Sequence, residues 1–209
     1  MLKASFLFFS LLVCTVVFCQ SFEGKLIYNN SYKSKIASVP DDQFNTMMGT
    51  KQVYLIKGGN YKSTMDGTMM QWQLYRSADN KLYMKMATSP VVYWNDGAVN
   101  PDEVQEARVN KAVKTILGYS CDELVLTCKS GVQKYYFSSR LKVDPKLFEK
   151  HKFGNWSEVL RHTKSLPLKT IVETPQFVLE STAVEVSDQK VDDKEFQLPP
   201  NVELQKSPF

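Results

Sequence analysis

The fold is decided by residues 52–87, which contain the runs QVYLIK (52–57), NYKSTM (60–65), MMQWQLYR (69–76) and KLYMKMA (81–87). Short turn sequences separate these runs, namely Gly58-Gly59, Asp66-Gly67 and SADN at 77–80. Gly, Asn and Asp adopt positive φ at little cost, so each of these sequences is typical of the turn in a β-hairpin. Consecutive hairpins at this spacing predict an antiparallel sheet rather than alternating strands and helices.

The strand pattern continues on both sides of this stretch. Further strands are predicted at residues 22–28, 91–94, 114–119, 123–128, 133–137, 168–173 and 177–186. Short helices are predicted from Pro40 to Gly49, after Asp144-Pro145, and from Asn155 to a stop at Pro167. The chain is therefore predicted to be mainly β (α+β).

An antiparallel sheet of about nine or ten strands curls, because large open sheets close, split or wrap around something. Sequential hairpins favour a barrel-like arrangement. We therefore expect a curved antiparallel sheet that forms a half-barrel, with about two or three short helices over its concave face.

Residues 1–19 are predicted to be a secretory signal peptide. Lys3 precedes an uncharged apolar run at residues 4–18, and polar residues follow from Gln20. The run is shorter than the ~20 residues needed to cross a bilayer, which argues against a retained anchor. Cleavage after Cys19 would leave residues 20–209 as a single β-rich domain, either periplasmic or secreted. Lipidation of Cys19 in an outer-membrane lipoprotein is the alternative, although Phe18 stands where a lipobox has a small residue.

The charge pattern gives no sign of a nucleic-acid partner. The formal net charge of the 209-residue chain is +4, and the basic residues are scattered among acidic ones. Nucleic-acid binding requires a basic stripe that neutralises phosphates. We predict no nucleic-acid partner.

Cys121 and Cys128 remain after removal of the signal peptide, in a compartment that permits disulfides. The residues between them form a predicted strand, which would hold their Cα atoms on the order of 23 Å apart. A disulfide needs Cα atoms within about 7 Å. We favour two separate buried thiols over a Cys121–Cys128 disulfide, which would require a turn at Asp122-Glu123.

Methionine is concentrated in the hairpin region, between Met47 and Met86. Methionine packs against varied apolar shapes and is common on surfaces that accept hydrophobic ligands. Because side chains alternate along a strand, residues 82, 84 and 86 share one face of their strand, as do 70, 72 and 74 of theirs. The predicted cavity-lining residues are Met65, Met70, Trp72, Leu74, Leu82, Met84 and Met86. The alternatives are a solid core filled by methionine and a thioether site for Cu(I).

Motifs for catalysis are missing from the sequence. It has no G-x-S-x-G elbow, no P-loop and no dinucleotide fingerprint. The 2 histidines, His151 and His162, lack metal-ligand spacing and are predicted to lie on the surface. Cys121 lies in an apolar strand, which favours a packing role over nucleophilic chemistry. We predict a non-enzyme with no metal and no cofactor, and carboxylates brought together by folding remain the alternative.

Several short segments resemble a known family. They are residues 20–28 (QSFEGKLIY), 116–123 (ILGYSCDE), 166–169 (LPLK) and 196–199 (FQLP). They resemble a family of exported Bacteroidetes-type proteins of unknown function, which is similar to the lipoprotein-localisation (LolA/LolB/LppX-like) superfamily. The resemblance covers nearly the whole mature chain. It implies a half-barrel capped by short helices, enclosing an apolar cavity, in a Gram-negative periplasm or on the outer membrane. It also implies that the strand containing Cys121 is structural.

Together these features predict a non-enzymatic periplasmic or secreted binding protein. Its partner would be a hydrophobic small molecule or lipid, such as an acyl chain or a lipoprotein segment, held in an apolar cavity. One alternative is a structural or interaction module of the cell envelope with a solid core, which would contact outer-membrane or envelope proteins. A second alternative is an enzyme.

Overall fold

The computed structural model describes residues 21–208 of the chain, and the predicted signal peptide with Cys19 lies outside these residues. The described residues form a 12-stranded sheet in the order β12-β6-β5-β4-β3-β2-β1-β11-β10-β9-β8-β7. The strands are β1 (Gly24–Ser34), β2 (Lys51–Lys57), β3 (Asn60–Met65), β4 (Met70–Arg76), β5 (Lys81–Met86), β6 (Val92–Asp96), β7 (Val104–Ile116), β8 (Tyr119–Cys128), β9 (Gly131–Lys142), β10 (Ser165–Glu173), β11 (Phe177–Asp188) and β12 (Leu204–Lys206).

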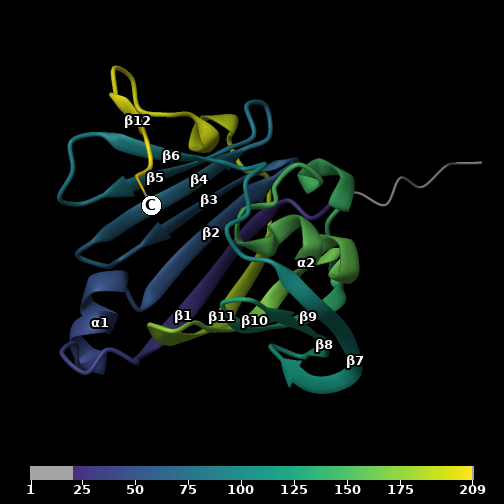
Figure 1. Cartoon of the computed structure of the whole chain (residues 1–209). Coiled ribbons are helices and arrows are strands. Elements are labelled where there is room, and N and C mark those ends of the chain that lie inside the picture. The colour runs from purple at the N-terminus through teal and green to yellow at the C-terminus, as the bar shows by residue number, and fades with distance from the viewer. Residues whose placement is uncertain (1–20, 209) are drawn as a thin grey trace, which may run out of the picture.

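Neighbouring strands are antiparallel except β12, which runs parallel to β6. The sheet is curved and open, with β12 and β7 at its two edges (Figure 1). The prediction of a mainly β chain with a curved antiparallel sheet is confirmed at this level, and the sheet does not close into a barrel.

The hairpins at residues 51–86 match their turn chemistry with one exception. Gly58 and Asn80 have φ of 55° and 51°, as their turns require. Gly67 does not adopt positive φ. A Cβ at this position would lie 2.5 Å from the carbonyl oxygen of Met47, so a larger residue would fit only if helix α1 (Asp41–Met48) moved away from the turn.

The longest strand was only partly anticipated by the sequence. A strand was expected at residues 114–119, whereas β7 runs over Val104–Ile116 and the chain turns at Leu117 and Gly118, with φ of 49° and 74°. Most side chains of β7 are exposed, because this edge strand is little covered on either face. It therefore lacks the alternation of apolar and polar residues that marks a half-buried strand.

Short helices lie on different sides of the sheet. The remaining helical segments are η1 (Pro145–Phe148), η2 (Phe153–Asn155), α2 (Trp156–Thr163) and η3 (Asp193–Phe196). Helix α2 with η1 and η2 covers the concave face, while α1 lies beside the end of β1 (Figure 1). Helix α2 ends at Thr163, before Pro167, because Lys164 takes a left-handed conformation with φ of 50°.

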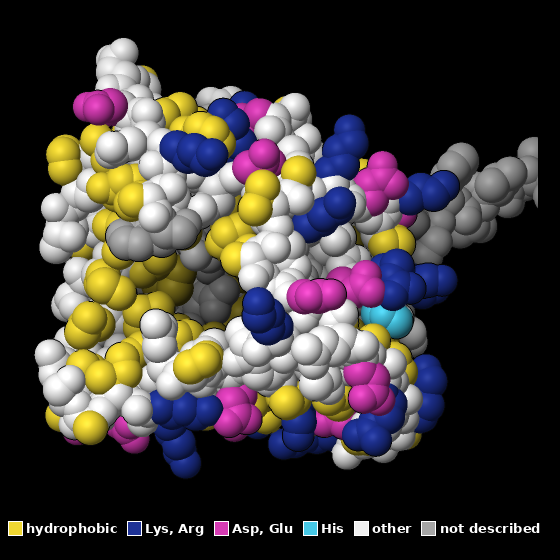
Figure 2. Space-filling model, in the orientation of Figure 1, with side chains coloured by type: hydrophobic (Ala, Val, Ile, Leu, Met, Phe, Trp, Pro, Cys, Tyr) yellow, Lys and Arg dark blue, Asp and Glu magenta, His cyan; other side chains and the backbone are white. Residues whose placement is uncertain are grey.

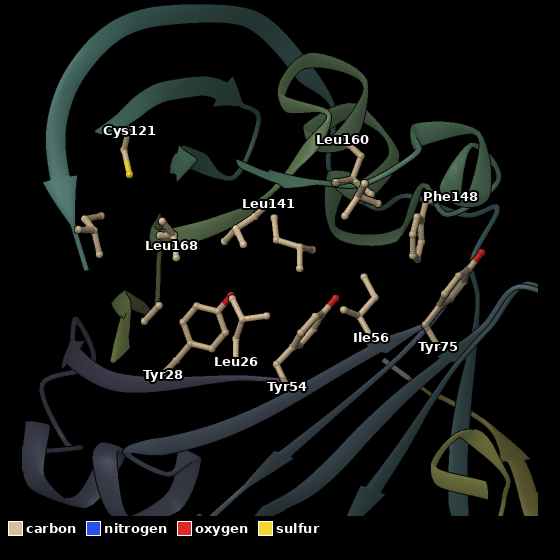
Figure 3. Close-up of a cluster of buried hydrophobic side chains, with 14 of the residues drawn as sticks. Leu26, Tyr28, Tyr54, Ile56, Tyr75, Cys121, Leu141, Phe148, Leu160 and Leu168 are labelled. Atoms are coloured by element: carbon tan, nitrogen blue, oxygen red, sulfur yellow. The ribbon is translucent and has the colours of Figure 1, made fainter. Parts of the chain in front are cut away.

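The main core fills the space between the concave face and the α2 region. Leu26 and Ile56 point up from the sheet, and Leu168, Phe148 and Leu160 belong to the same cluster (Figure 3). A second cluster under α2 contains Leu124, Leu126 and Val159. On the opposite face, a third cluster joins Phe196 of η3 to the sheet. The sheet is thus covered on both faces, but by different parts of the chain.

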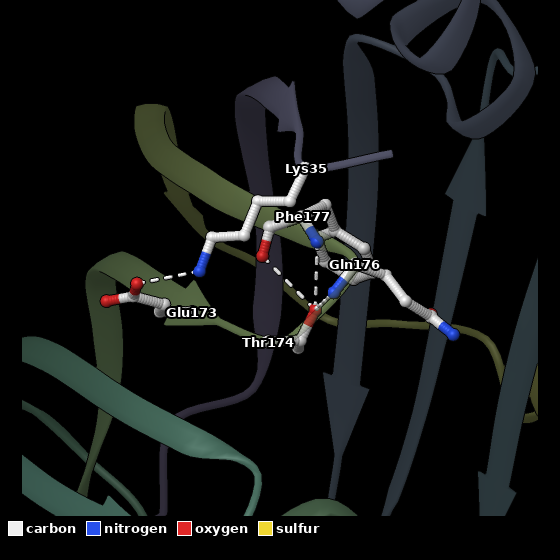
Figure 4. Close-up of polar contacts among 5 residues, drawn as sticks. All are labelled: Lys35, Glu173, Thr174, Gln176 and Phe177. Carbon is white, nitrogen blue, oxygen red and sulfur yellow. Dashed lines mark hydrogen bonds and ion pairs between the residues drawn. The ribbon is translucent and has the colours of Figure 1, made fainter. Parts of the chain in front are cut away.

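The β10–β11 turn places an aromatic side chain against α1. The Thr174 hydroxyl oxygen accepts hydrogen bonds from the backbone N–H groups of Gln176 (3.2 Å) and Phe177 (3.1 Å), and Lys35 forms an ion pair with Glu173 (2.7 Å; Figure 4). The Phe177 ring packs 5.2 Å from that of Phe44 in α1. The contact between Phe44 and Phe177 holds α1 against the start of β11.

Candidate functional site

The concave face carries a hollow bordered by hydrophobic side chains, between strands β2–β5 and the α2 region (Figure 2). An apolar cavity of about 190 Å³ lies between the concave face and the start of α2. It is lined by Tyr28, Gln52, Tyr54, Tyr135, Trp156, Leu166, Pro167, Thr170, Leu179 and Ser181. We call it the α2 cavity, because Trp156 at the start of α2 forms part of its wall.

Strand register builds the floor of the α2 cavity. Tyr135 of β9 is opposite Thr170 of β10, which in turn is opposite Ser181 of β11. Gln52 of β2 is opposite Tyr28 of β1. Directly opposed residues in a sheet have side chains on the same face, so these groups project together from strands far apart in sequence.

Tyrosines of β1 and β2 set the shape of one wall. The Tyr28 and Tyr54 rings meet edge to face, with centroids 6.4 Å apart. The Tyr28 hydroxyl donates to the carbonyl oxygen of Pro167 (2.8 Å), which ties β1 to β10 across β11. The Tyr54 hydroxyl points away from β2 into the interior (Figure 3).

Asn155 fixes the opposite wall, because it directly precedes Trp156. Its side chain is 2% exposed, and its amide N–H groups contact Asp102 (3.3 Å) and the oxygen of Gln133 (3.4 Å). The same Gln133 oxygen accepts a hydrogen bond from the Tyr135 hydroxyl (2.8 Å). This polar network attaches the first turn of α2 to β9 and so positions Trp156 over the cavity.

Two polar atoms of the lining residues are buried without a hydrogen-bond partner among residues 21–208, the hydroxyl oxygen of Tyr54 and Nε1 of Trp156. Burial raises the pKa of Tyr54 well above its ordinary value, with smaller contributions from Tyr61 and Tyr28. The Tyr54 hydroxyl therefore keeps its proton at neutral pH and acts as a donor.

His151 lies in the interior rather than on the surface, which corrects the sequence-based prediction. It is 1% exposed, its ring stacks 3.8 Å from that of Tyr75, and its Nε2 is 2.7 Å from the Tyr61 hydroxyl. Burial lowers the pKa of His151 to about 3. Charged imidazole is thus excluded near neutral pH, and the ring belongs to an aromatic stack behind the cavity.

A second cavity of about 290 Å³ lies between β5, β6 and η2. Its lining includes Met84, Val99, Phe153 and Lys206. Met84 is the predicted cavity-lining residue that lines this second cavity.

The structure divides the predicted cavity-lining residues between two faces. Met84 packs against the main core with Leu82, and the register places Met70 opposite Met86. Met65 is opposite Gln52, beside the α2 cavity. These methionines share the concave face.

Trp72 and Leu74 are separated from that group. Both belong to the cluster on the opposite face, with Phe196 of η3. The expectation that Met70, Trp72 and Leu74 share a face is wrong, because a register shift between Met70 and Trp72 interrupts the alternation of β4.

Cys121 and Cys128 are free and buried, as favoured from the sequence. Burial raises the pKa of both thiols, that of Cys128 to about 12 with a further contribution from Asp102. Neither is a thiolate nucleophile at neutral pH. Within residues 21–208 no group of three or more His, Cys, Asp or Glu is arranged to hold a metal ion. None of the helices in this described part combines the length and hydropathy needed to span a membrane.

Comparisons with known proteins give structural similarities of low strength. No family model and no curated protein matches the chain. PNGF-II in space group C2 is 14% identical with a TM-score of 0.48, over 90% of this chain and 31% of that one. An uncharacterized conserved protein from Thermus thermophilus is 6% identical with a TM-score of 0.43, over 87% and 90% of the two chains. LprF from Mycobacterium bovis is 8% identical with a TM-score of 0.28, over 80% and 89%.

The chain spans about a third of the length of PNGF-II, which is thus a much larger protein. The resemblance to the lipoprotein-localisation superfamily stays a prediction.

The sequence analysis missed the residues that line the α2 cavity. Tyr54 belonged to a correctly predicted strand, and Trp156 to a correctly predicted helix start. One signal was available, since Gln52, Tyr54 and Ile56 share one face of β2. The strand pairing that brings this face of β2 near β9, β10 and β11 joins residues far apart in sequence, so no local sequence pattern reveals it.

Proposed function

We propose that this chain is a non-enzymatic binding protein that holds a hydrophobic ligand against the concave face of its curved, half-barrel sheet. The observation that carries the proposal is the α2 cavity, which is lined mainly by tyrosine, tryptophan and aliphatic side chains. Binding sites for small apolar ligands are concave, mostly apolar and largely preformed. The raised thiol pKa values and the buried neutral histidine support binding over catalysis.

The size of the α2 cavity limits what it accepts. A cavity of about 150 Å³ lined by aliphatic side chains and phenylalanine binds benzene. The α2 cavity, at about 190 Å³, therefore fits one ring or a short acyl segment. Met65 beside it and the other methionines of the concave face provide a flexible apolar surface for the rest of a longer ligand.

A space-filling substitution tests the proposal. Thr170→Phe places a ring in the α2 cavity, whereas Ile171→Phe adds a ring to the opposite face of the same strand. We expect toluene, followed by NMR titration, to bind the wild type and Ile171→Phe with similar affinity. Binding should weaken at least about tenfold in Thr170→Phe, since the added ring occupies the volume that the ligand needs. Absence of toluene binding to the wild type would contradict the proposal.

We further propose that the protein is exported, with residues 1–19 removed as a signal peptide. The apolar run after Lys3 supports this. Mass spectrometry of the mature protein should give Gln20 as its first residue. A diacylglyceryl group on Cys19 would instead identify a membrane-anchored lipoprotein.

A second candidate function is protein interaction through β7. This strand forms one edge of the sheet over 13 residues, and no described strand pairs with its outer side. An unpaired edge can accept a strand from a partner. Such a partner would protect the amide groups of β7 from hydrogen exchange, and a hydrophobic ligand in the α2 cavity would not.

A further inference from the structure

We infer that the α2 cavity selects an apolar ligand carrying a neutral oxygen acceptor, such as a ketone, ester or amide carbonyl, which receives hydrogen bonds from Tyr54 and Trp156. This inference rests on the proposed function and names the ligand class for the same site. The donors are the hydroxyl of Tyr54 and the indole Nε1–H of Trp156.

The first support is the state of these donors. Tyr54 is 8% exposed, and both its hydroxyl and Nε1 of Trp156 are buried without a partner among the described residues. Buried polar groups in proteins are nearly always satisfied, and an unsatisfied one is costly. Tyr28 shows the contrast within the same cavity, because its hydroxyl is bonded to Pro167.

The second support is their placement. Tyr54 belongs to β2 in the sheet, whereas Trp156 begins the helix that covers the sheet, and both line the same cavity. The cavity is therefore bordered by Tyr54 on the side of the sheet and by Trp156 on the side of the helix. A carbonyl oxygen has two lone pairs and can accept from both.

The charge of the lining residues indicates a neutral acceptor. None of the residues that line the α2 cavity is Lys, Arg or His. Burying a carboxylate without a cation costs far more free energy than burying a carbonyl that is hydrogen-bonded. The ligand class is thus an ester or ketone rather than a free acid.

Isosteric probes test this. Acetophenone and α-methylstyrene have the same shape, but acetophenone has a carbonyl oxygen where α-methylstyrene has a CH₂ group. Both are titrated by NMR into the wild type, Tyr54→Phe and Tyr28→Phe. In each protein we take the ratio of acetophenone affinity to α-methylstyrene affinity. The difference in hydrophobicity between the probes contributes equally to every ratio, so it cancels when the ratios of two proteins are compared.

We expect this ratio to fall about tenfold in Tyr54→Phe, because the ketone loses a buried donor and the alkene does not. It should stay within about twofold of wild type in Tyr28→Phe, whose hydroxyl is already engaged. Acetophenone should also move the Trp156 indole N–H resonance downfield, and α-methylstyrene should not. Benzoate, the charged analogue, should bind more weakly than acetophenone.

The outcomes separate the two proposals. An unchanged ratio in Tyr54→Phe, or benzoate as the tightest probe, would overturn the inference while binding of α-methylstyrene still supports the proposed function. If neither neutral probe binds the wild type, the proposed function itself fails.

Discussion

At the scale of single residues, His151 shows how burial determines chemistry. Its ring lies against Tyr75 and contacts the Tyr61 hydroxyl, and its pKa is lowered to about 3. The native protein therefore holds a neutral imidazole at pH values where the unfolded chain, with a pKa near 6.5, already binds a proton.

This difference predicts a loss of stability in acid. Between pH 6.5 and about 3 the unfolded state binds more protons than the native state, so the free energy of unfolding decreases as the pH falls. The decrease should approach about 1.4 kcal/mol per pH unit within that window. Urea unfolding at pH 7, 6 and 5 should show it in the wild type and a flatter profile in His151→Phe.

The comparison is restricted to pH 5 and above because carboxylates titrate below it. His151→Phe is expected to be less stable at pH 7, since the Tyr61 hydroxyl loses its partner. Equal slopes in the two proteins would contradict the lowered pKa of His151.

The environment of this histidine could not be predicted from its neighbours in sequence. Lys150 and Lys152 flank His151 and are exposed, which is typical of a surface segment. The packing that buries the ring comes from Tyr61 and Tyr75, which lie in distant hairpin strands.

At the scale of elements, α1 is held by a close backbone approach. A Cβ on Gly67 would lie 2.5 Å from the carbonyl oxygen of Met47, whereas a Cβ on Gly58 would meet nothing within 4 Å. These turns look similar in sequence but constrain the glycine for different reasons, contact at Gly67 and positive φ at Gly58.

Alanine substitutions should distinguish the two constraints. Gly58→Ala should cost about 1 kcal/mol, as is usual for a left-handed conformation of an ordinary residue. Gly67→Ala should cost about 2–3 kcal/mol, because α1 must move away from the turn. Urea unfolding gives both losses in the free energy of unfolding from the shift in midpoint, provided that the dependence on urea concentration is unchanged. A larger loss in Gly58→Ala than in Gly67→Ala would contradict these two constraints.

Helix α2 depends on Asn155 at its first turn. Asn155 has a left-handed φ of 63°, and its side chain hydrogen-bonds to Asp102 and Gln133. We expect Asn155→Ala to lower the free energy of unfolding by about 2–4 kcal/mol, since it removes bonds to a carboxylate and strains the backbone.

Asn155→Gly separates these contributions, because glycine adopts the left-handed conformation without strain. It should be about 1 kcal/mol more stable than Asn155→Ala. Both variants should weaken toluene binding, because Trp156 loses its anchor. Full stability in Asn155→Gly would show that the side-chain bonds contribute nothing.

The sequence predicted elements well where turns were short. Strands β2 to β5 begin and end within about one residue of their expected bounds, because each is bracketed by turn residues. For β7, the sequence predicted only the last residues of the strand. A solvent-exposed edge strand lacks the alternation of apolar and polar residues that marks a half-buried strand.

At the scale of the whole molecule, the candidate site depends on long-range pairing. The sequence predicted the curved sheet and an apolar concave face, but it placed the ligand among residues of β3 to β5. The residues that line the α2 cavity come mainly from β1, β2, β9, β10 and β11, which come together only when distant parts of the chain pair. The alternation of side chains along a strand shows which residues share a face of the sheet, but it does not show which strands are neighbours.

The position of β1 in the sheet also affects how the protein reaches its folded state. β1 is the first strand among the described residues 21–208, yet it pairs with β2 on one side and with β11 on the other. The β1–β11 pairing joins Gly24 to Asp188, so it forms only after nearly all of the chain is available. Closing so long a loop slows folding, because its entropy is lost before the contacts form. A chain that emerges from its N-terminus would therefore stay incompletely folded until its synthesis is almost finished.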